Sequence, residues 1–191
     1  MAAPTTRFRL IPQSTTVAAL DTATERLDTI SGQSVVSTGA GNEVDFSTVD
    51  ISEGAANSTV KTVLWDVTAD GGNTLVEDFR LWMSSNGFDQ AGTVLKIQPL
   101  QGADGTPVLT EDYVADAVVA SYTWSTCPET LPGAQNVYPT DEGTSMAVTT
   151  ASDDVVMWAM YLAVAASETT GTYKGTDAGY EFQMSFRYSY S

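Results

Sequence analysis

The side chains that most enzymes use for proton transfer and nucleophilic attack are scarce in this chain of 191 residues. It has no histidine and a single cysteine, Cys127. Histidine is the side chain that most often serves as a general base or metal ligand at neutral pH, so no Ser-His-Asp or Cys-His arrangement can form within the chain. Cys127 precedes Pro128 in a Ser-Thr-Cys-Pro segment. We interpret it as a half-buried loop residue rather than a nucleophile.

Carboxylates are the remaining candidates for catalysis, because two carboxyl groups a few ångströms apart can hydrolyse a glycosidic bond. Adjacent acidic pairs occur at Glu77-Asp78, Glu111-Asp112, Asp141-Glu142 and Asp153-Asp154. Neighbouring residues of a strand point to opposite faces, however, and acidic residues in loops usually stabilise turns. The chain also has no nucleotide-binding glycine motif and no Cys/His zinc spacing. We therefore expect no catalytic residues, and a carboxylate-dependent hydrolase is the least favoured alternative.

Oxygen-bearing side chains in or near glycine-rich loops could bind calcium. These residues are Asp66, Asp70, Asn73, Asp104, Asp153 and Asp154. None of them follows the spaced acidic pattern of an EF-hand loop, and aspartate and asparagine are ordinary turn residues. We therefore expect no metal site and no cofactor.

The N-terminal segment combines cationic and apolar side chains. Two of the eight basic residues of the chain lie here, between two prolines. The alternating residues are Arg7, Phe8, Arg9, Leu10 and Ile11. An extended segment of this kind can add a strand to the sheet edge of a partner. We predict that residues 1–13 form an extended arm ahead of the compact domain, that these five residues bind a partner, and that the arm adds little to stability; a frayed terminus is the alternative.

The four tryptophans are further candidates for contact. Trp65 and Trp158 fall on strongly apolar strand faces, which favours packing in a core. Trp82 alternates with apolar neighbours and lies beside Arg80, so it is the best candidate for an exposed aromatic that contacts a protein or a glycan. Burial of Trp82 in the core or between two sheets is nevertheless favoured over exposure.

Charge and hydropathy exclude several classes of partner. The chain has 24 acidic and 8 basic residues and a formal net charge of −16, whereas proteins that bind nucleic acids need clustered cations. Residues 1–12 contain no apolar run long enough for a signal peptide. The longest apolar block, Val155 to Ala166, is shorter than the roughly 18 residues of a transmembrane helix. We expect no nucleic-acid partner and no membrane partner, and synthesis and folding in a cytoplasm.

Period-two and doubly apolar segments predict β-strands. They are Val60–Val67, Leu75–Met83, Thr93–Gln98, Val155–Val164 and Tyr180–Tyr190. The segment Val155–Val164 is apolar on both faces and is interpreted as a central strand, with a buried helix as the alternative. The turn cluster Asp70–Asn73 predicts that the first two strands form a hairpin.

Other segments are less clearly patterned. Glu43–Ile51 is predicted to be an edge strand, and Val118–Trp124 and Thr144–Thr149 are weaker strand candidates. The apolar spacing in Val17–Ile30 and Thr110–Val119 is close to helical, although strands or ordered loops fit equally well. Together the segments predict an all-β protein: one antiparallel β-sandwich domain over residues 14–191, with a jelly-roll-like arrangement, preceded by the arm.

The pattern of an arm at Thr5–Pro12, an acidic β-domain rich in Ser, Thr and Gly, and an aromatic terminal strand Tyr180–Tyr190 resembles the small virion proteins of tailed bacteriophages. It is most similar in type to the decoration or cement proteins that coat a capsid exterior. The resemblance implies a jelly roll or sandwich, often trimeric, seated where capsid subunits meet.

From this resemblance we expect a non-catalytic structural protein that binds and stabilises the outer shell through its arm and through oligomeric contacts. Its expected partners are capsid or other virion proteins and further copies of itself, with a trimer favoured. Its expected location is the virion, after synthesis in the host cytoplasm. Two alternatives are a carbohydrate-binding jelly-roll module and a tail, neck or fibre component of a phage.

Overall fold

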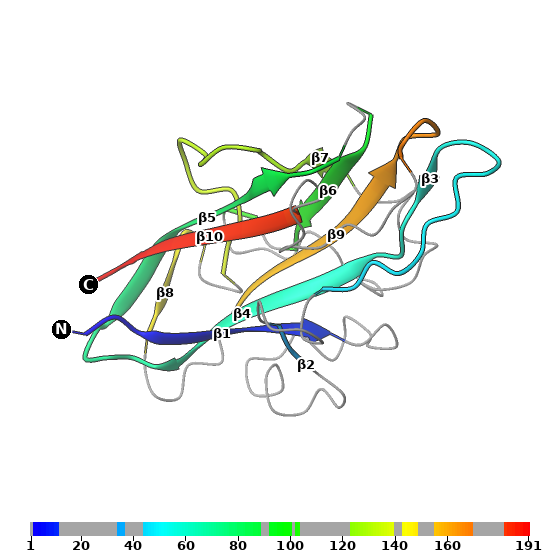
Figure 1. Cartoon of the computed structure of the whole chain (residues 1–191). Helices are drawn as coiled ribbons and strands as arrows, with labels where there is room; N and C mark the ends of the chain where they lie inside the picture. The colour runs from blue at the N-terminus through cyan, green and yellow to red at the C-terminus, as the bar shows by residue number, and fades with distance from the viewer. Residues whose placement is uncertain are drawn as a thin grey trace.

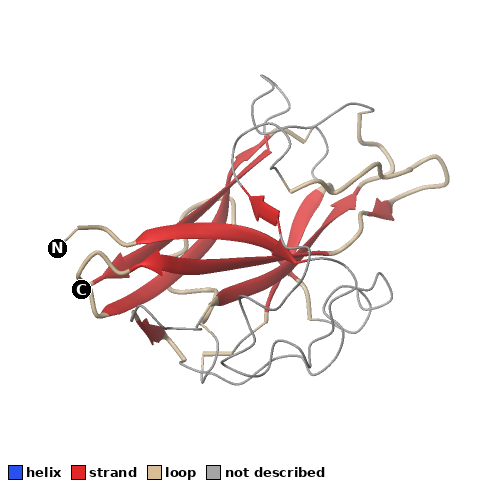
Figure 2. Ribbon diagram, turned by 90° about the horizontal axis from the view of Figure 1, so that it is seen from below, coloured by secondary structure: helices blue, strands red, loops and turns tan. Residues whose placement is uncertain are grey.

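The computed structural model describes residues 2–11, 34–36, 44–88, 92–100, 102–103, 123–139, 143–148, 155–169 and 182–191. These residues form ten strands, and there is no helix among them. The strands make two antiparallel sheets that pack face to face as a sandwich (Figures 1 and 2). The predicted all-β sandwich is therefore confirmed, and the jelly-roll arrangement stays a prediction.

The larger sheet has seven strands in the order β2-β1-β4-β9-β6-β7, with β3 paired to β9. Its strands are β1 (Thr5–Ile11), β2 (Ser34–Val36), β3 (Ala56–Asn57), β4 (Lys61–Ala69), β6 (Val94–Pro99), β7 (Ser125–Thr126) and β9 (Val156–Val164). The smaller sheet has three strands in the order β10-β5-β8. Its strands are β5 (Leu75–Asn86), β8 (Ser145–Ala147) and β10 (Phe182–Tyr190).

Strand β9 lies between β4 and β6, which confirms the central strand predicted from its two apolar faces. Val156, Trp158 and Met160 belong to the core between the sheets. Met157 and Ala159 point to the opposite face and are also buried. Both faces of the larger sheet are thus buried along β9, as expected for a strand with no polar side.

Aromatic rings fill the core between the sheets. Trp65 of β4 is fully buried and its ring centroid lies 5.5 Å from that of Phe79 of β5. Phe186 of β10 lies 5.2 Å from Trp65 and 5.7 Å from Trp158. These rings join β4 and β9 of one sheet to β5 and β10 of the other, so they fix how the two sheets face each other.

The predicted hairpin between β4 and β5 is wrong. Both strands form where they were expected, but β4 pairs with β1 and β9, whereas β5 pairs with β10 and β8. The physical reason is that both strands are strongly apolar on one side. They bury those sides against each other across the core, at Trp65 and Phe79, instead of pairing edge to edge. The turn at Asp70–Asn73 therefore connects the two sheets.

The same turn holds both ends of the described chain. Ala2 N donates to Gly71 O at 3.1 Å, and Asn73 Nδ2 donates to Ala2 O at 2.7 Å. Thr74 N donates to Ser191 O at 2.7 Å. The two ends consequently lie at the same end of the sandwich, as Figure 1 shows.

The predicted edge strand at Glu43–Ile51 is also wrong over its described part, because residues 44–51 contain no strand. Phe46 is buried, and side chains form local turns around it. Asp45 Oδ1 accepts from Ser47 N at 2.7 Å, and Asp50 Oδ1 accepts from Ser52 N at 2.9 Å. Such side-chain bonds offer the backbone an alternative to a sheet ladder.

The N-terminal segment differs most from its prediction. Thr5–Ile11 is extended, but it is strand β1 of the larger sheet, with β2 on one side and β4 on the other. The physical reason is that both edges of this strand form hydrogen-bonded pairs with strands of the same chain. The segments Val17–Ile30 and Thr110–Val119 lie outside the described residues, as does the strand candidate Val118–Trp124 except for residues 123–124, which are not in a strand.

Candidate functional site

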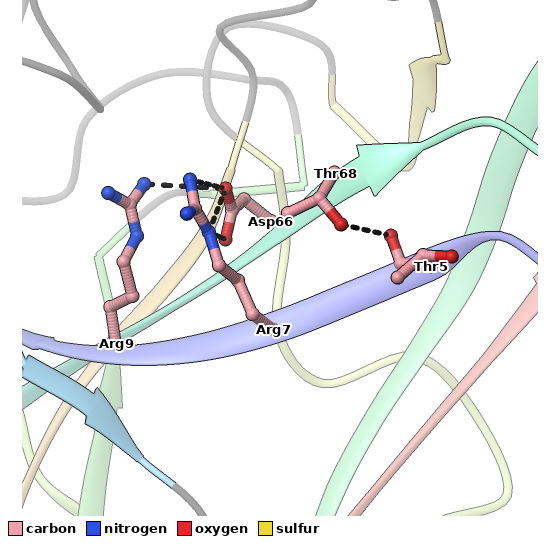
Figure 3. Close-up of polar contacts among 5 residues, drawn as sticks. All are labelled: Thr5, Arg7, Arg9, Asp66 and Thr68. Carbon is pink, nitrogen blue, oxygen red and sulfur yellow. Dashed lines mark hydrogen bonds and ion pairs between the residues drawn. The ribbon is translucent and has the colours of Figure 1, made fainter.

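The predicted arm cations bind a carboxylate of the same chain (Figure 3). Arg7 Nε donates to both carboxylate oxygens of Asp66 at 3.0 Å, and Arg7 Nη2 lies 2.9 Å from Asp66 Oδ2. Arg9 Nη2 lies 3.4 Å from the same oxygen. The Asp66 and Arg9 side chains are only 2% and 8% exposed, whereas that of Arg7 is 38% exposed. We call these three residues the Asp66 cluster.

The Asp66 cluster follows from the register of the strands. Arg7 lies directly opposite Asp66 in the antiparallel pairing of β1 with β4, and Arg9 is the next residue of β1 on the same face. A carboxylate taken out of water is costly unless it is paired and hydrogen-bonded. Two guanidinium groups supply that compensation here. The cluster thus attaches β1 to β4, and the cations serve the fold of this chain.

The apolar side of β1 faces the core. The Phe8 ring centroid lies 5.6 Å from that of Phe186 and 6.2 Å from that of Trp158. Leu10 also packs against the core cluster, and both side chains stay partly exposed. The Cα of Ile11 pairs with that of Thr62, while its side chain lies outside the described residues.

Trp82, the remaining predicted contact residue, lies on β5 and is partly exposed. It alternates with the buried Leu81 and Met83, so it faces outward from the smaller sheet. On this outer face Ser185 lies opposite Trp82, and Arg187 lies opposite Arg80. The structure therefore does not bring the predicted residues into one site, because Trp82 and the Asp66 cluster lie on the outer faces of different sheets.

Arg80 is held in place by the strand and the loop beside it. Its Nε donates to Asp78 Oδ1 at 2.8 Å, and its Nη1 donates to Pro132 O at 2.7 Å. Asp78 has a positive φ of 60° and lies in a β-bulge, where Asp78 and Phe79 together oppose Tyr188. The bulge thus lets one carboxylate hold an arginine on the outer face of the smaller sheet.

The sequence predicts that Met184 and Phe186 of β10 face a core and that Tyr188 and Tyr190 bury less, but it does not predict an exposed apolar side along the strand. Met184, Phe186 and Tyr188 pack against the core cluster but are only partly buried, and Tyr190 is 45% exposed. With Phe8 and Leu10 they form an apolar strip that we call the β1–β10 seam. The available signal was the alternation in Tyr180–Tyr190, which places its aromatic side chains on one side of the strand.

Asp66 was considered in the sequence only as a possible calcium ligand. The signal for its actual role was a lone carboxylate within the apolar run Val63–Val67, in a chain with few cations. The rare cations at Arg7 and Arg9 are the natural partners of such a buried charge.

The fold also uses two other candidate groups among the described residues, Cys127 and Asp70. Cys127 is buried, and desolvation raises the pKa of its thiol to about 12, so the thiolate is not populated at neutral pH. Asp70 Oδ1 accepts from Gly72 N at 2.9 Å in a local turn. Within the described ranges no group of three or more Cys, Asp or Glu side chains could hold a metal ion. The acidic pairs after Glu77-Asp78, together with Asp104, lie outside those ranges.

Comparison with known proteins gives no relative from which a role could be carried over. No protein-family model matches the sequence, and no curated protein matches it either. Within the part of the chain that the structure describes, no helix has the length and apolar character needed to cross a membrane.

Proposed function

We propose that this chain is a non-catalytic structural protein of a virion, a capsid decoration or cement protein of the tailed-bacteriophage type. The observation that supports the non-catalytic part is how three reactive groups of the described residues are used. Asp66 is bound by Arg7 and Arg9, Asp78 binds Arg80, and the thiol of Cys127 is buried with its pKa raised. The virion part rests on the resemblance of the sequence in type.

The proposed setting follows from the charge and the sandwich. A protein with a net charge of −16 is suited to the outside of a particle and poorly suited to contact with packaged nucleic acid. We propose that it acts in the virion, after synthesis in the host cytoplasm, with capsid or other virion proteins and further copies of itself as partners. Since β1 is paired within the sheet, the contacts would use outer surfaces of the folded sandwich in place of a free arm.

The test is to locate the protein on particles. Gold-labelled antibodies against the purified chain would be applied to intact particles from host cells that carry the gene, and viewed by electron microscopy. The proposal expects labels on the outside of the heads. Labels on tails or fibres would move the protein to those structures, and particles that carry no label at all would refute a virion role.

A carbohydrate-binding module is the second candidate, and one observation favours it. The partly exposed ring of Trp82 lies on a sheet face beside Arg80, with Ser185 and Arg187 on the neighbouring strand. A tryptophan next to guanidinium groups can stack on a sugar ring and bind an acidic substituent.

Glycan-array binding distinguishes the two functions. A carbohydrate module requires binding of defined glycans that Trp82→Ala abolishes. Trp124→Ala is the matched control, since Trp124 packs edge-on against Tyr161 at a centroid distance of 4.7 Å. Failure of the chain to bind any glycan, or equal binding by the Trp82 variant, would contradict the carbohydrate module, and the structural role would be the remaining candidate.

A further inference from the structure

The two edges of β5 have different neighbours in the described structure. Loop residues cover one edge beyond β8: Met83 N donates to Pro128 O at 2.8 Å, and the Asn136 amide bonds both Leu81 N and Leu81 O at 2.8 Å. The other edge pairs with β10. Among the described residues β10 has no further strand beside it, so it is the outermost strand of the smaller sheet on that side.

Strand β10 lacks the features that usually prevent edge strands from pairing. Such edges are commonly short, or carry proline, lysine or a bulge. β10 has nine residues and contains neither proline nor lysine. The two irregularities in its pairing place the extra residues, near Asp78 and Ser84, in β5. β10 itself therefore runs without interruption.

The charge of β10 also differs from that of the chain. Residues 182–191 contain no aspartate or glutamate side chain, although the chain has 24 acidic residues. The one charged side chain of the strand is Arg187. Two copies with a net charge of −16 each repel one another, but bringing their β10 strands together does not place carboxylate side chains of these strands against each other.

The apolar side of β10 supplies a second, independent reason for contact. Phe186 contacts Phe8, Trp65 and Trp158, yet the seam residues Phe186 and Tyr188 remain partly exposed. Tyr190 is 45% exposed on the same side of the strand. Covering this aromatic surface removes apolar area from water and is therefore favourable.

We infer that β10 pairs antiparallel with β10 of a second copy of this chain, around a two-fold axis. The pairing joins two three-stranded sheets into one sheet of six strands across the dimer. The seams of the two copies meet on one side of this sheet. The inference goes beyond the proposed function and does not depend on it, because a dimer of this kind can form wherever the protein acts.

The sequence of β10 is self-complementary in one register. When Phe186 lies opposite Phe186 of the second copy, all nine residues pair, because the strand runs from Phe182 to Tyr190. Tyr188 then lies opposite Met184 of the second copy, which places seam residues on seam residues. Arg187 lies opposite Ser185 of the second copy, so the two arginines are not opposite each other. A two-fold interface needs this kind of self-match.

The first experiment changes the charge opposite Arg187. Ser185→Lys places like charges opposite each other at two symmetric positions, and Ser185→Glu places opposite charges there. Both variants lose the same exposed hydrogen bond from Ser185 Oγ to Ser84 Oγ and gain a long side chain, so the main difference between them is the sign of the charge. Sedimentation equilibrium should show a dimer whose dissociation constant rises about tenfold in the Lys variant and does not rise in the Glu variant.

Adding Arg187→Glu to Ser185→Lys should restore the dimer, since the opposed charges are then complementary. Melting temperatures of all variants check that each one folds. A monomeric chain, a trimer, or a dimer that responds equally to Lys and Glu at position 185 would overturn the inference.

The second experiment tests the register. Residues directly opposite in a strand pair have Cα atoms about 4.5–5.5 Å apart, which a disulfide spans, whereas diagonal residues are about 7–8 Å apart. A mixture of Ser185→Cys and Arg187→Cys chains should form a disulfide-linked dimer on oxidation, and either variant alone should not. Cys127 is buried and leaves the background low. Equal cross-linking of the single variants contradicts the register. Particle labelling remains a separate result, so failure of the virion role leaves the dimer intact.

Discussion

The strands nearest the two ends of the described chain, β1 and β10, have similar alternating sequences but different positions in their sheets. Each alternates aromatic or aliphatic residues with polar ones and carries arginine on its polar side. Each also contributes to the same aromatic contacts, where the rings of Phe8 and Phe186 lie 5.6 Å apart. β1, however, lies between β2 and β4, whereas β10 pairs only with β5 among the described residues.

The difference between these strands lies on their polar sides. In β1 the arginines meet a buried carboxylate, Asp66, and one of them is itself buried. In β10 Arg187 is exposed and lies opposite another arginine, Arg80. An alternating pattern thus predicts a strand but does not tell whether its polar side faces water. The partner strand decides that, because a buried charge requires a counter-charge at the matching register.

The largest effect is expected from breaking the Asp66 cluster. Asp66→Asn keeps the shape of the side chain but removes the buried carboxylate charge that Arg7 and Arg9 bind. Removing one partner of a buried ion pair costs about 3–5 kcal/mol. Urea denaturation, followed by tryptophan fluorescence, should show this loss in the free energy of unfolding. The exposed Glu77→Gln serves as the control and should change it by less than about 0.5 kcal/mol.

This change also tests the setting of β1 directly. If residues 2–11 were a free arm, Asp66 would have no role in the stability of the domain. An Asp66→Asn protein as stable as the unchanged chain would therefore support the arm and contradict the pairing of β1 with β4.

The next effect concerns the aromatic contact that the two strands share. Phe186→Ala should cost about 3 kcal/mol and Phe8→Ala about 2 kcal/mol, at and below the lower end of the roughly 3–5 kcal/mol range for a buried phenylalanine, because both rings are partly exposed. Their direct edge-to-face contact should appear as a coupling of about 0.5–1.5 kcal/mol in a double-mutant cycle. The measurement is the free energy of unfolding of both single variants and the double variant, at a concentration where the chain is monomeric.

Strictly additive losses in this cycle would mean that β1 and β10 contribute to the core independently. Coupling in the expected range would show that the two strands stabilise each other across the open side of the sandwich.

A smaller effect is expected from the contact between the Asp70–Asn73 turn and the backbone before β1. A Cβ on Gly71 would lie 2.6 Å from Ala2 O, whereas a Cβ on Gly72 meets nothing within 4 Å. Both glycines have positive φ, so Gly72→Ala should cost about 1 kcal/mol from backbone strain alone. Gly71→Ala should cost about 2–3 kcal/mol, since it also displaces the backbone before β1.

Thermal unfolding of the two glycine variants, with and without removal of residues 2–4, checks the source of the difference. The excess cost of Gly71→Ala should vanish in the shortened chain. An excess that persists would place the strain in the turn itself and not in its contact with Ala2.

The sequence predicted the strands that carry a clear pattern, and the reasons it failed elsewhere are physical. The block at β9, which is apolar on both faces, and the alternation in β10 were sufficient to predict these two strands, because few structures other than a β-strand bury such patterns. The prediction of a β4–β5 hairpin was wrong because turn residues do not show whether the two strands pair by hydrogen bonds in one sheet or pack face to face in two sheets. The contact between Trp65 and Phe79 settles that question, and it depends on residues far outside the turn.

The candidate site was predicted less well than the fold. Trp82 was expected to face away from its apolar neighbours, and it does. The cations of β1 were assigned to a partner because their carboxylate, Asp66, lies 59 residues from Arg7 in sequence. No local pattern links such distant residues. The seam was missed for the same reason, because its exposure depends on which strand lies next to β10.

The smallest effect is expected from the arginine of β10, and its sign is informative. Arg187 lies directly opposite Arg80, and like charges at opposed positions destabilise a sheet. Arg187→Ser should therefore leave the free energy of unfolding unchanged or raise it by up to about 0.5 kcal/mol at low salt. Because the side chain is exposed, the gain should shrink as salt screens the repulsion.

The corresponding change in β1, Arg9→Ser, should instead destabilise the chain at every salt concentration, since Arg9 is buried against Asp66. Equal responses of the two variants would contradict the distinction between the polar sides of β1 and β10.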